Sequence, residues 1–119
     1  MGLFSRKAAA SQPTIQYSEQ KHGLNDPGFW VGYVSYCQPQ LAWVASQIGW
    51  QPSEQPSQAV IGLVKPDRNT PRNPNGMRVE VAGQTIGYTP RANHGQRAGQ
   101  APVVLVKQGQ DILAWVGTA

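Results

Sequence analysis

The sequence predicts a mainly β fold: a small closed or half-closed β-barrel of about six strands, with one short amphipathic helix and a mobile N-terminal tail. Three observations support this expectation. Short apolar runs alternate with turn residues, the chain contains 13 glycines and 10 prolines among 119 residues, and only one segment shows helical periodicity. Short strands at such spacing are typical of barrels, and a chain of this length forms one domain plus tails.

Residues 1–27 form the predicted flexible tail, and residues 28–119 form the predicted barrel domain. The tail lacks hydrophobic periodicity and closes with a turn cluster at residues 25–28. Segments of this kind at chain ends are commonly mobile. Ile15 and Tyr17 are spaced for a short edge strand, which is a weak signal of order within the tail.

The predicted domain begins with a strand at residues 29–36, where aromatic and β-branched residues favour an extended backbone. A second strand is expected at residues 59–65, in which Gly62 indicates a bulge. The last two strands are expected at residues 103–107 and 112–116, joined by a Gln-Gly-Gln turn.

A short helix is expected at residues 39–48. Pro39 suits the first helical turn, where its missing N–H costs nothing, and Gly49 supplies a stop. Four apolar residues at i, i+3, i+4 and i+7 form one stripe, namely Leu41, Val44, Ala45 and Ile48.

Residues 77–88 contain the clearest local signal, that of a β-hairpin. The segment 77–82 alternates apolar and polar side chains, as a half-buried strand does. Ala82-Gly83 occupies the place of a two-residue turn, because glycine tolerates positive φ, and Thr89-Pro90 ends the return strand. The expected core joins three residues of the helical stripe to five of the strands, namely Leu41, Val44 and Ile48 with Val79, Val81, Ile86, Val104 and either Leu105 or Val106.

The sequence offers no catalytic constellation, so we expect a non-enzyme without metal or cofactor. A single cysteine, Cys37, excludes an internal disulfide and a thiolate zinc site, and such a cysteine packs as a small hydrophobe. His22 and His94 have no second ligand at metal spacing. Because a signal-peptide region and a bilayer-length apolar run are both lacking, we expect a cytoplasmic protein with no membrane partner.

Positive charge is concentrated in one third of the chain. Residues 65–97 hold six cations against Asp67 and Glu80, which accounts for the whole net charge of +4. Clustered arginine beside a barrel-like segment favours a polyanionic partner, whereas a solvated face that serves solubility is the alternative. The cations are Lys65, Arg68, Arg72, Arg78, Arg91 and Arg97.

Four aromatic residues are candidates for a platform on which bases stack. Stacking of a base on an aromatic side chain contributes about 1–3 kcal/mol. The alternative is a barrel core lined with these rings. The candidates are Trp30, Tyr33, Tyr36 and Tyr88.

Three segments of the chain resemble the HIRAN domain, a small β-barrel module found in some helicase-like ATPases and as a free-standing bacterial and phage domain. Residues 31–38 are similar to the family's opening V-G-x-x-x-Y strand, and the helix at 39–48 follows it as in the family. Residues 70–79 resemble the family's N-P-Y-D-x-N-A-V-x-V loop and strand, and residues 83–91 its G-x-x-V-G-Y-L-P-R. The similarity covers about residues 31–116.

The resemblance implies a nucleic-acid-binding module whose ligand site lies on the loop before the hairpin. In the family, an Asn, a Tyr and an Asp of that loop, with a Tyr of the first strand, grip the 3′ end of single-stranded DNA. This chain has Thr70, Arg72, Asn73 and Ser35 at those positions. Arg72 keeps the capacity to stack on a base or pair with phosphate, so we expect binding that does not depend on the 3′-hydroxyl.

The predicted function is therefore a non-catalytic HIRAN-like module that binds DNA, single-stranded or non-specific, through a basic loop. The nucleic-acid-binding residues are expected to be Tyr36, Lys65, Arg68, Arg72, Asn73 and Arg91. The alternative is a structural or protein-interaction module of a phage or mobile element with no nucleic-acid binding. A steep fall of affinity with salt would favour the first function, and an exposed apolar patch would favour the second.

Overall fold

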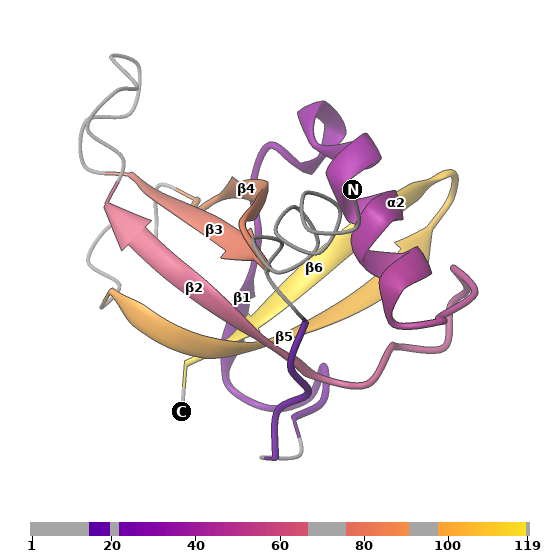
Figure 1. Ribbon diagram of the computed structural model, residues 1–119, viewed down its shortest axis with the longest axis horizontal. Coiled ribbons are helices and arrows are strands. Elements are labelled where there is room, and N and C mark those ends of the chain that lie inside the picture. The colour runs from indigo at the N-terminus through magenta and orange to yellow at the C-terminus, as the bar shows by residue number, and fades with distance from the viewer. Residues whose placement is uncertain (1–14, 20–21, 67–75, 91–97, 119) are drawn as a thin grey trace, which may run out of the picture.

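The computed structural model of the protein describes residues 15–19, 22–66, 76–90 and 98–118. Its six strands form one antiparallel sheet in the order β1-β6-β5-β2-β3-β4, and the sheet curls into a half-barrel (Figure 1). The elements are β1 (Gly28–Trp30), η1 (Val34–Tyr36), α2 (Gln38–Gln47), β2 (Val60–Pro66), β3 (Met77–Val81), β4 (Gln84–Tyr88), β5 (Gly99–Gln108) and β6 (Asp111–Gly117). The mainly β, half-barrel architecture predicted from the sequence is confirmed.

The two edges of the curled sheet meet at the Gly32–Tyr88 bridge. Just past β1, Gly32 N–H donates to Tyr88 O at 2.7 Å, and Tyr88 N–H donates to Gly32 O at 3.0 Å. The neighbouring Gly87 has φ +151°, and a Cβ added there would lie 2.3 Å from Val31 Cγ1 and 2.4 Å from Gly32 O. Only glycine fits at position 87 beside this bridge, because glycine lacks a Cβ and tolerates the positive φ.

Helix α2 covers one side of the half-barrel, where it contacts β4 and β6 (Figure 1). Its buried stripe is Leu41, Val44 and Ala45, as the 3.6-residue period predicts. The stop at Gly49 is also confirmed: with φ +66°, it allows Trp50 N–H to donate to Ala45 O at 3.0 Å, which is a Schellman closure of the helix.

The predicted hairpin is confirmed in both strands and in the turn. Ala82 and Gly83 have φ values of +50° and +81°, as a two-residue hairpin turn of type I′ requires. The register shifts between Val79 and Glu80, so the bulge lies in this hairpin. The bulge predicted at Gly62 is wrong, because Gly62 pairs regularly with β5 and allows a close approach of the next strand.

The first predicted strand is too long, and the reason is the crossing from one sheet edge to the other. Strand β1 ends at Trp30, and Val31 N–H still donates to Ala114 O of β6 at 2.9 Å. The chain then leaves β6 to bridge β4 at Gly32. Tyr33 follows with φ +61°, and the remainder of the predicted strand is the 3₁₀ turn η1.

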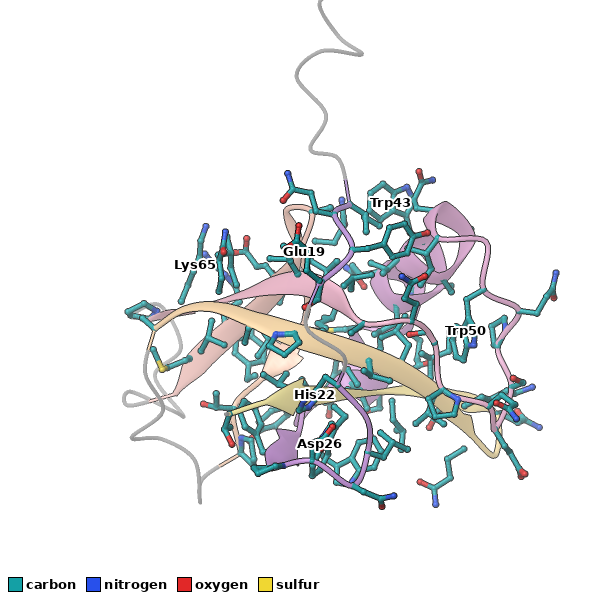
Figure 2. All side chains as sticks on the ribbon, turned by 90° about the horizontal axis from the view of Figure 1, so that it is seen from below. Glu19, His22, Asp26, Trp43, Trp50 and Lys65 are labelled. Carbon is teal, nitrogen blue, oxygen red and sulfur yellow. The ribbon has the colours of Figure 1, made fainter. Side chains whose placement is uncertain are left out.

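Part of the predicted N-terminal tail packs on the sheet, which corrects the expectation for residues 15–19 and 22–27. Ile61 N–H donates to Gln16 O at 2.8 Å, and Ser18 N–H donates to Ala59 O at 2.9 Å. The His22 side chain is only 2% exposed and lies against Gly117. Figure 2 shows His22 and Asp26 along the face of the sheet. Tyr17 forms an antiparallel bridge with Val60, so the weak signal of a short edge strand at Ile15 and Tyr17 is confirmed.

Two strand edges in the described structure are completed by other groups. The Gln38 carboxamide makes the two hydrogen bonds to Ile112 of β6 that a neighbouring strand would make. Its Oε1 accepts from Ile112 N–H at 2.9 Å, and its Nε2 donates to Ile112 O at 3.0 Å. Along β5, Ser57 N–H donates to Leu105 O at 2.8 Å, and Leu105 N–H donates to Ser57 Oγ at 2.9 Å. The Pro/Ser-rich linker predicted around residues 50–58 therefore lines the sheet.

The core joins α2 to the concave face of the sheet. Of the expected core residues, Ile48 is only partly buried, because it caps the helix at its end. Val104 is fully buried but lies outside the main cluster, since it alternates with Val103 and Leu105 along β5. The fully buried expected residues are Leu41, Val44, Val79, Val81, Ile86, Val104 and Leu105.

Candidate nucleic-acid interface

A row of cationic and aromatic side chains crosses the outer face of the sheet, the face that points away from the core. The strand register sets Lys65 of β2 opposite Arg78 of β3, and Arg78 opposite Tyr88 of β4. Residues directly opposite each other in antiparallel strands share a face and lie within side-chain reach. We call these three residues, with Tyr33 and Tyr36 described next, the outer row.

Three tyrosines cluster at one end of the outer row. The Tyr33 ring lies edge-on to Tyr88, with centroids 6.0 Å apart and planes at 85°, and its centroid is 6.4 Å from that of Tyr36. Tyr33 is 56% exposed and Tyr36 is 80% exposed. Because a tyrosine at φ +61° carries backbone strain that the surrounding structure must sustain, such a position is a candidate for function.

The mostly buried carboxylate of Glu80 forms ion pairs with both cations of the outer row. Glu80 Oε1 lies 3.4 Å from Lys65 Nζ, and Glu80 Oε2 forms an ion pair with Arg78 Nε. The Arg78 N–H is not aligned for a hydrogen bond, so the contact is one of charge. The Glu80 side chain is 10% exposed and that of Lys65 is 45% exposed, so Lys65 presents its charge to solvent while the carboxylate stays below it.

Two of the six predicted binding residues, Tyr36 and Lys65, are in the described structure, and both belong to the outer row. Trp30, a candidate for the stacking platform, does not join the tyrosines. Its ring instead packs edge-on against Trp115, with centroids 5.0 Å apart. The other four predicted binding residues lie outside the described residues, namely Arg68, Arg72, Asn73 and Arg91.

The segments that hold those four residues are joined to the structure at the same end of the sheet as the outer row. Pro66 pairs with Met77, and Thr89 N–H donates to Met77 O at 2.8 Å. Strand β5 begins beside the end of β2. The described residues that flank segments 67–75 and 91–97 therefore lie at this end of the sheet, and the sequences of the two segments contain four arginines.

The residues that sequence reasoning left out of the site are Arg78, Tyr33 and Tyr88. Arg78 was among the clustered cations, and the tyrosines were among the stacking candidates. What was lacking was the register, which sets Arg78 between Lys65 and Tyr88. The hairpin periodicity already placed Arg78 and Glu80 on one outward face, and this signal was available.

Cys37 is buried at the start of α2, and desolvation by burial raises the pKa of its thiol. A raised pKa leaves less thiolate at any given pH, and the thiolate is the reactive form. We expect iodoacetamide to alkylate Cys37 more slowly in the folded protein than in the urea-denatured chain, with the half-maximal rate at a higher pH. A mass-spectrometric time course is unambiguous because the chain has one cysteine. Equal rates in both states would contradict the burial.

The described residues hold no group of three or more His, Cys, Asp or Glu side chains placed to bind a metal ion. No helix in this part of the chain combines the length and apolar character needed to cross a bilayer. No family model, curated protein or solved structure matches the chain.

Proposed function

We propose that this protein is a non-catalytic, HIRAN-like module that binds single-stranded nucleic acid, DNA in particular, across the outer row. The observation that supports the proposal most is the register that sets two cations beside three clustered tyrosines, two of which are more than half exposed. Grooves that bind single strands combine positive charge along the backbone path with aromatic faces for successive bases.

Each part of the outer row has a distinct task in this proposal. The exposed rings of Tyr33 and Tyr36 stack on bases, which tolerates any sequence because every base has a π-face. Lys65 and Arg78 face the phosphates, and the contact releases counterions from the strand. The sequences of segments 67–75 and 91–97 contain further arginines that would add to the positive charge.

A fluorescence-anisotropy titration of a labelled oligothymidylate tests the stacking contribution. We expect Tyr36→Ala to weaken binding by about 1–3 kcal/mol, the value of one base–aromatic stack. Because Tyr36 is exposed and makes no core contact, the thermal unfolding midpoint should stay close to that of the wild type. If a folded Tyr36→Ala variant bound with unchanged affinity, the tyrosines would not be part of the interface.

The same titration at two salt concentrations tests the phosphate contacts. We expect Lys65→Ala to reduce the slope of log affinity against log salt by roughly 0.7, as for one phosphate contact on a single strand. Lys107→Ala is the matched control, because this lysine lies near the opposite end of β5, next to the β5–β6 turn, and carries the same charge. Equal slope changes in the two variants would point to a general charge effect and not to a site.

The alternative function is a structural or protein-interaction module. One observation favours it: Trp30 is 42% exposed and packs on Trp115 at the sheet edge, and exposed aromatic surface is typical of protein interfaces. Failure of the protein to bind any oligonucleotide at low salt would favour this alternative.

A further inference from the structure

A pocket of about 320 Å³ opens on the outer face beside the outer row. Its apolar lining comes from Ile61 and Leu63 of β2 and from Ala82 of the β3–β4 turn. Leu63 is 37% exposed, so this apolar surface is open to a ligand. The volume is at the lower end of the range for small-molecule sites, which suits one ring system and not an extended ligand.

The polar groups of the pocket gather where it adjoins the outer row. Glu80 and Lys65 line that end, and Leu63 is paired directly with Glu80 across the strands. A carboxylate offers about four lone-pair sites on its two oxygens, of which Lys65 and Arg78 engage one oxygen each. Each oxygen therefore keeps a lone pair for a donor on a ligand, which would reach it through the tenth of the Glu80 side chain that stays exposed. Gln16 and Gln100 also line the pocket and add carboxamides.

The charge around Glu80 selects the kind of ligand. Two cations surround one carboxylate, so the local balance is positive. A basic peptide is disfavoured by that balance, whereas an anionic backbone next to a neutral ring with N–H donors satisfies both the cations and the carboxylate. A nucleotide unit has this combination, with its phosphate on Lys65 and its base over Ile61 and Leu63.

We propose that this pocket is a base-reading subsite of the interface and that it prefers guanine. Guanine presents two adjacent N–H donors, N1–H and the N2 amino group, on its Watson–Crick edge, and a carboxylate accepts both at once. Thymine offers one N–H between two carbonyl oxygens, which a carboxylate repels. Side chains that hydrogen-bond the Watson–Crick edges of unstacked bases provide the sequence specificity of single-strand recognition. This inference rests on the proposed function and adds sequence preference to it.

The test compares labelled oligonucleotides that differ in one base. The reference is an oligothymidylate of about ten nucleotides, within the site sizes of small barrels, and the others carry one central guanine or one central hypoxanthine, which lacks the N2 amino group. We expect the guanine oligonucleotide to bind about 5-fold or more tightly than either of the others, as one bidentate base contact provides. Equal affinities for all three would overturn the pocket inference and leave the proposed function standing, whereas no binding of any oligonucleotide would overturn both.

Two variants separate base reading from general affinity. Glu80→Gln removes a negative charge beside Lys65 and Arg78, so we expect tighter binding of every oligonucleotide together with loss of the guanine preference. Leu63→Phe fills the pocket from a partly exposed strand position and leaves Glu80 in place. It should also abolish the preference, so that the ratio of the affinities for the guanine oligonucleotide and for oligothymidylate falls to about one. A guanine preference that survives in folded Leu63→Phe would overturn the assignment, whatever the fate of Glu80→Gln.

Discussion

Replacing Gly87 by alanine is expected to cost about 3–5 kcal/mol of unfolding free energy, a large share of the 5–15 kcal/mol typical of a domain. Two effects add. An L-residue is strained at φ +151°, and the new Cβ would meet Val31 Cγ1 at 2.3 Å and Gly32 O at 2.4 Å. The backbone oxygen belongs to the bridge that joins the two sheet edges, so relief of the clash opens the barrel. Urea titration monitored by circular dichroism measures the loss.

Gly109→Ala is the matched control for this prediction. Gly109 also has positive φ, +63°, but nothing lies within 4 Å of a Cβ added there. Its substitution therefore carries only the left-handed backbone penalty, about 1–2 kcal/mol. If Gly87→Ala were no more destabilising than Gly109→Ala, the predicted clash of the new Cβ with Val31 and Gly32 would be wrong. The Gly32–Tyr88 bridge would then not require glycine at position 87.

Truncating Leu41 to alanine should cost about 2–5 kcal/mol, because it removes a large buried side chain and leaves a cavity. Leu41 is fully buried and belongs to the core cluster that α2 shares with the sheet. The lost packing lies between the helix and the concave face, so the barrel side that α2 covers is weakened as a whole. Chemical denaturation of the purified variant gives the difference directly.

Ile48→Ala is the control variant from the same helical stripe, and its loss of unfolding free energy is compared with that of Leu41→Ala. Ile48 is only partly buried, so its truncation should cost clearly less than that of Leu41. A loss below about 1 kcal/mol for Leu41→Ala, or a greater loss for Ile48→Ala, would show that the helix is seated on the sheet differently.

The parts of the fold that could be predicted from sequence are those set by local rules. The hairpin at 77–88 follows from alternation and from a turn that needs positive φ, and α2 follows from one apolar stripe closed by Gly49. The Gly32–Tyr88 bridge joins residues far apart in the sequence, and no local pattern reports such a contact. For the same reason, the strand predicted at 29–36 was too long, since its end is set by where the chain crosses to β4.

The candidate interface was predictable in composition but not in arrangement. Clustered cations and aromatic residues near the hairpin were visible in the sequence, and the structure places Lys65 and Tyr36 in the same outer row, where their binding role stays a prediction. The neighbours of Lys65 depend on inter-strand register, which alternation alone does not fix between strands separated by a loop. The pocket beside Glu80 depends on register as well, and also on Gln16, which comes from a segment without periodicity.

The Gln38 carboxamide that completes β6 has a consequence for behaviour in concentrated solution. An open strand edge offers a row of unpaired amides on which the strand of another molecule can dock, and this is a common start of aggregation. The Ile112 N–H and C=O are already engaged by one side chain, which cannot itself be extended into a further strand. A single glutamine thus occupies the backbone groups that a docking strand would need at this position, and it does so without adding a strand to the fold.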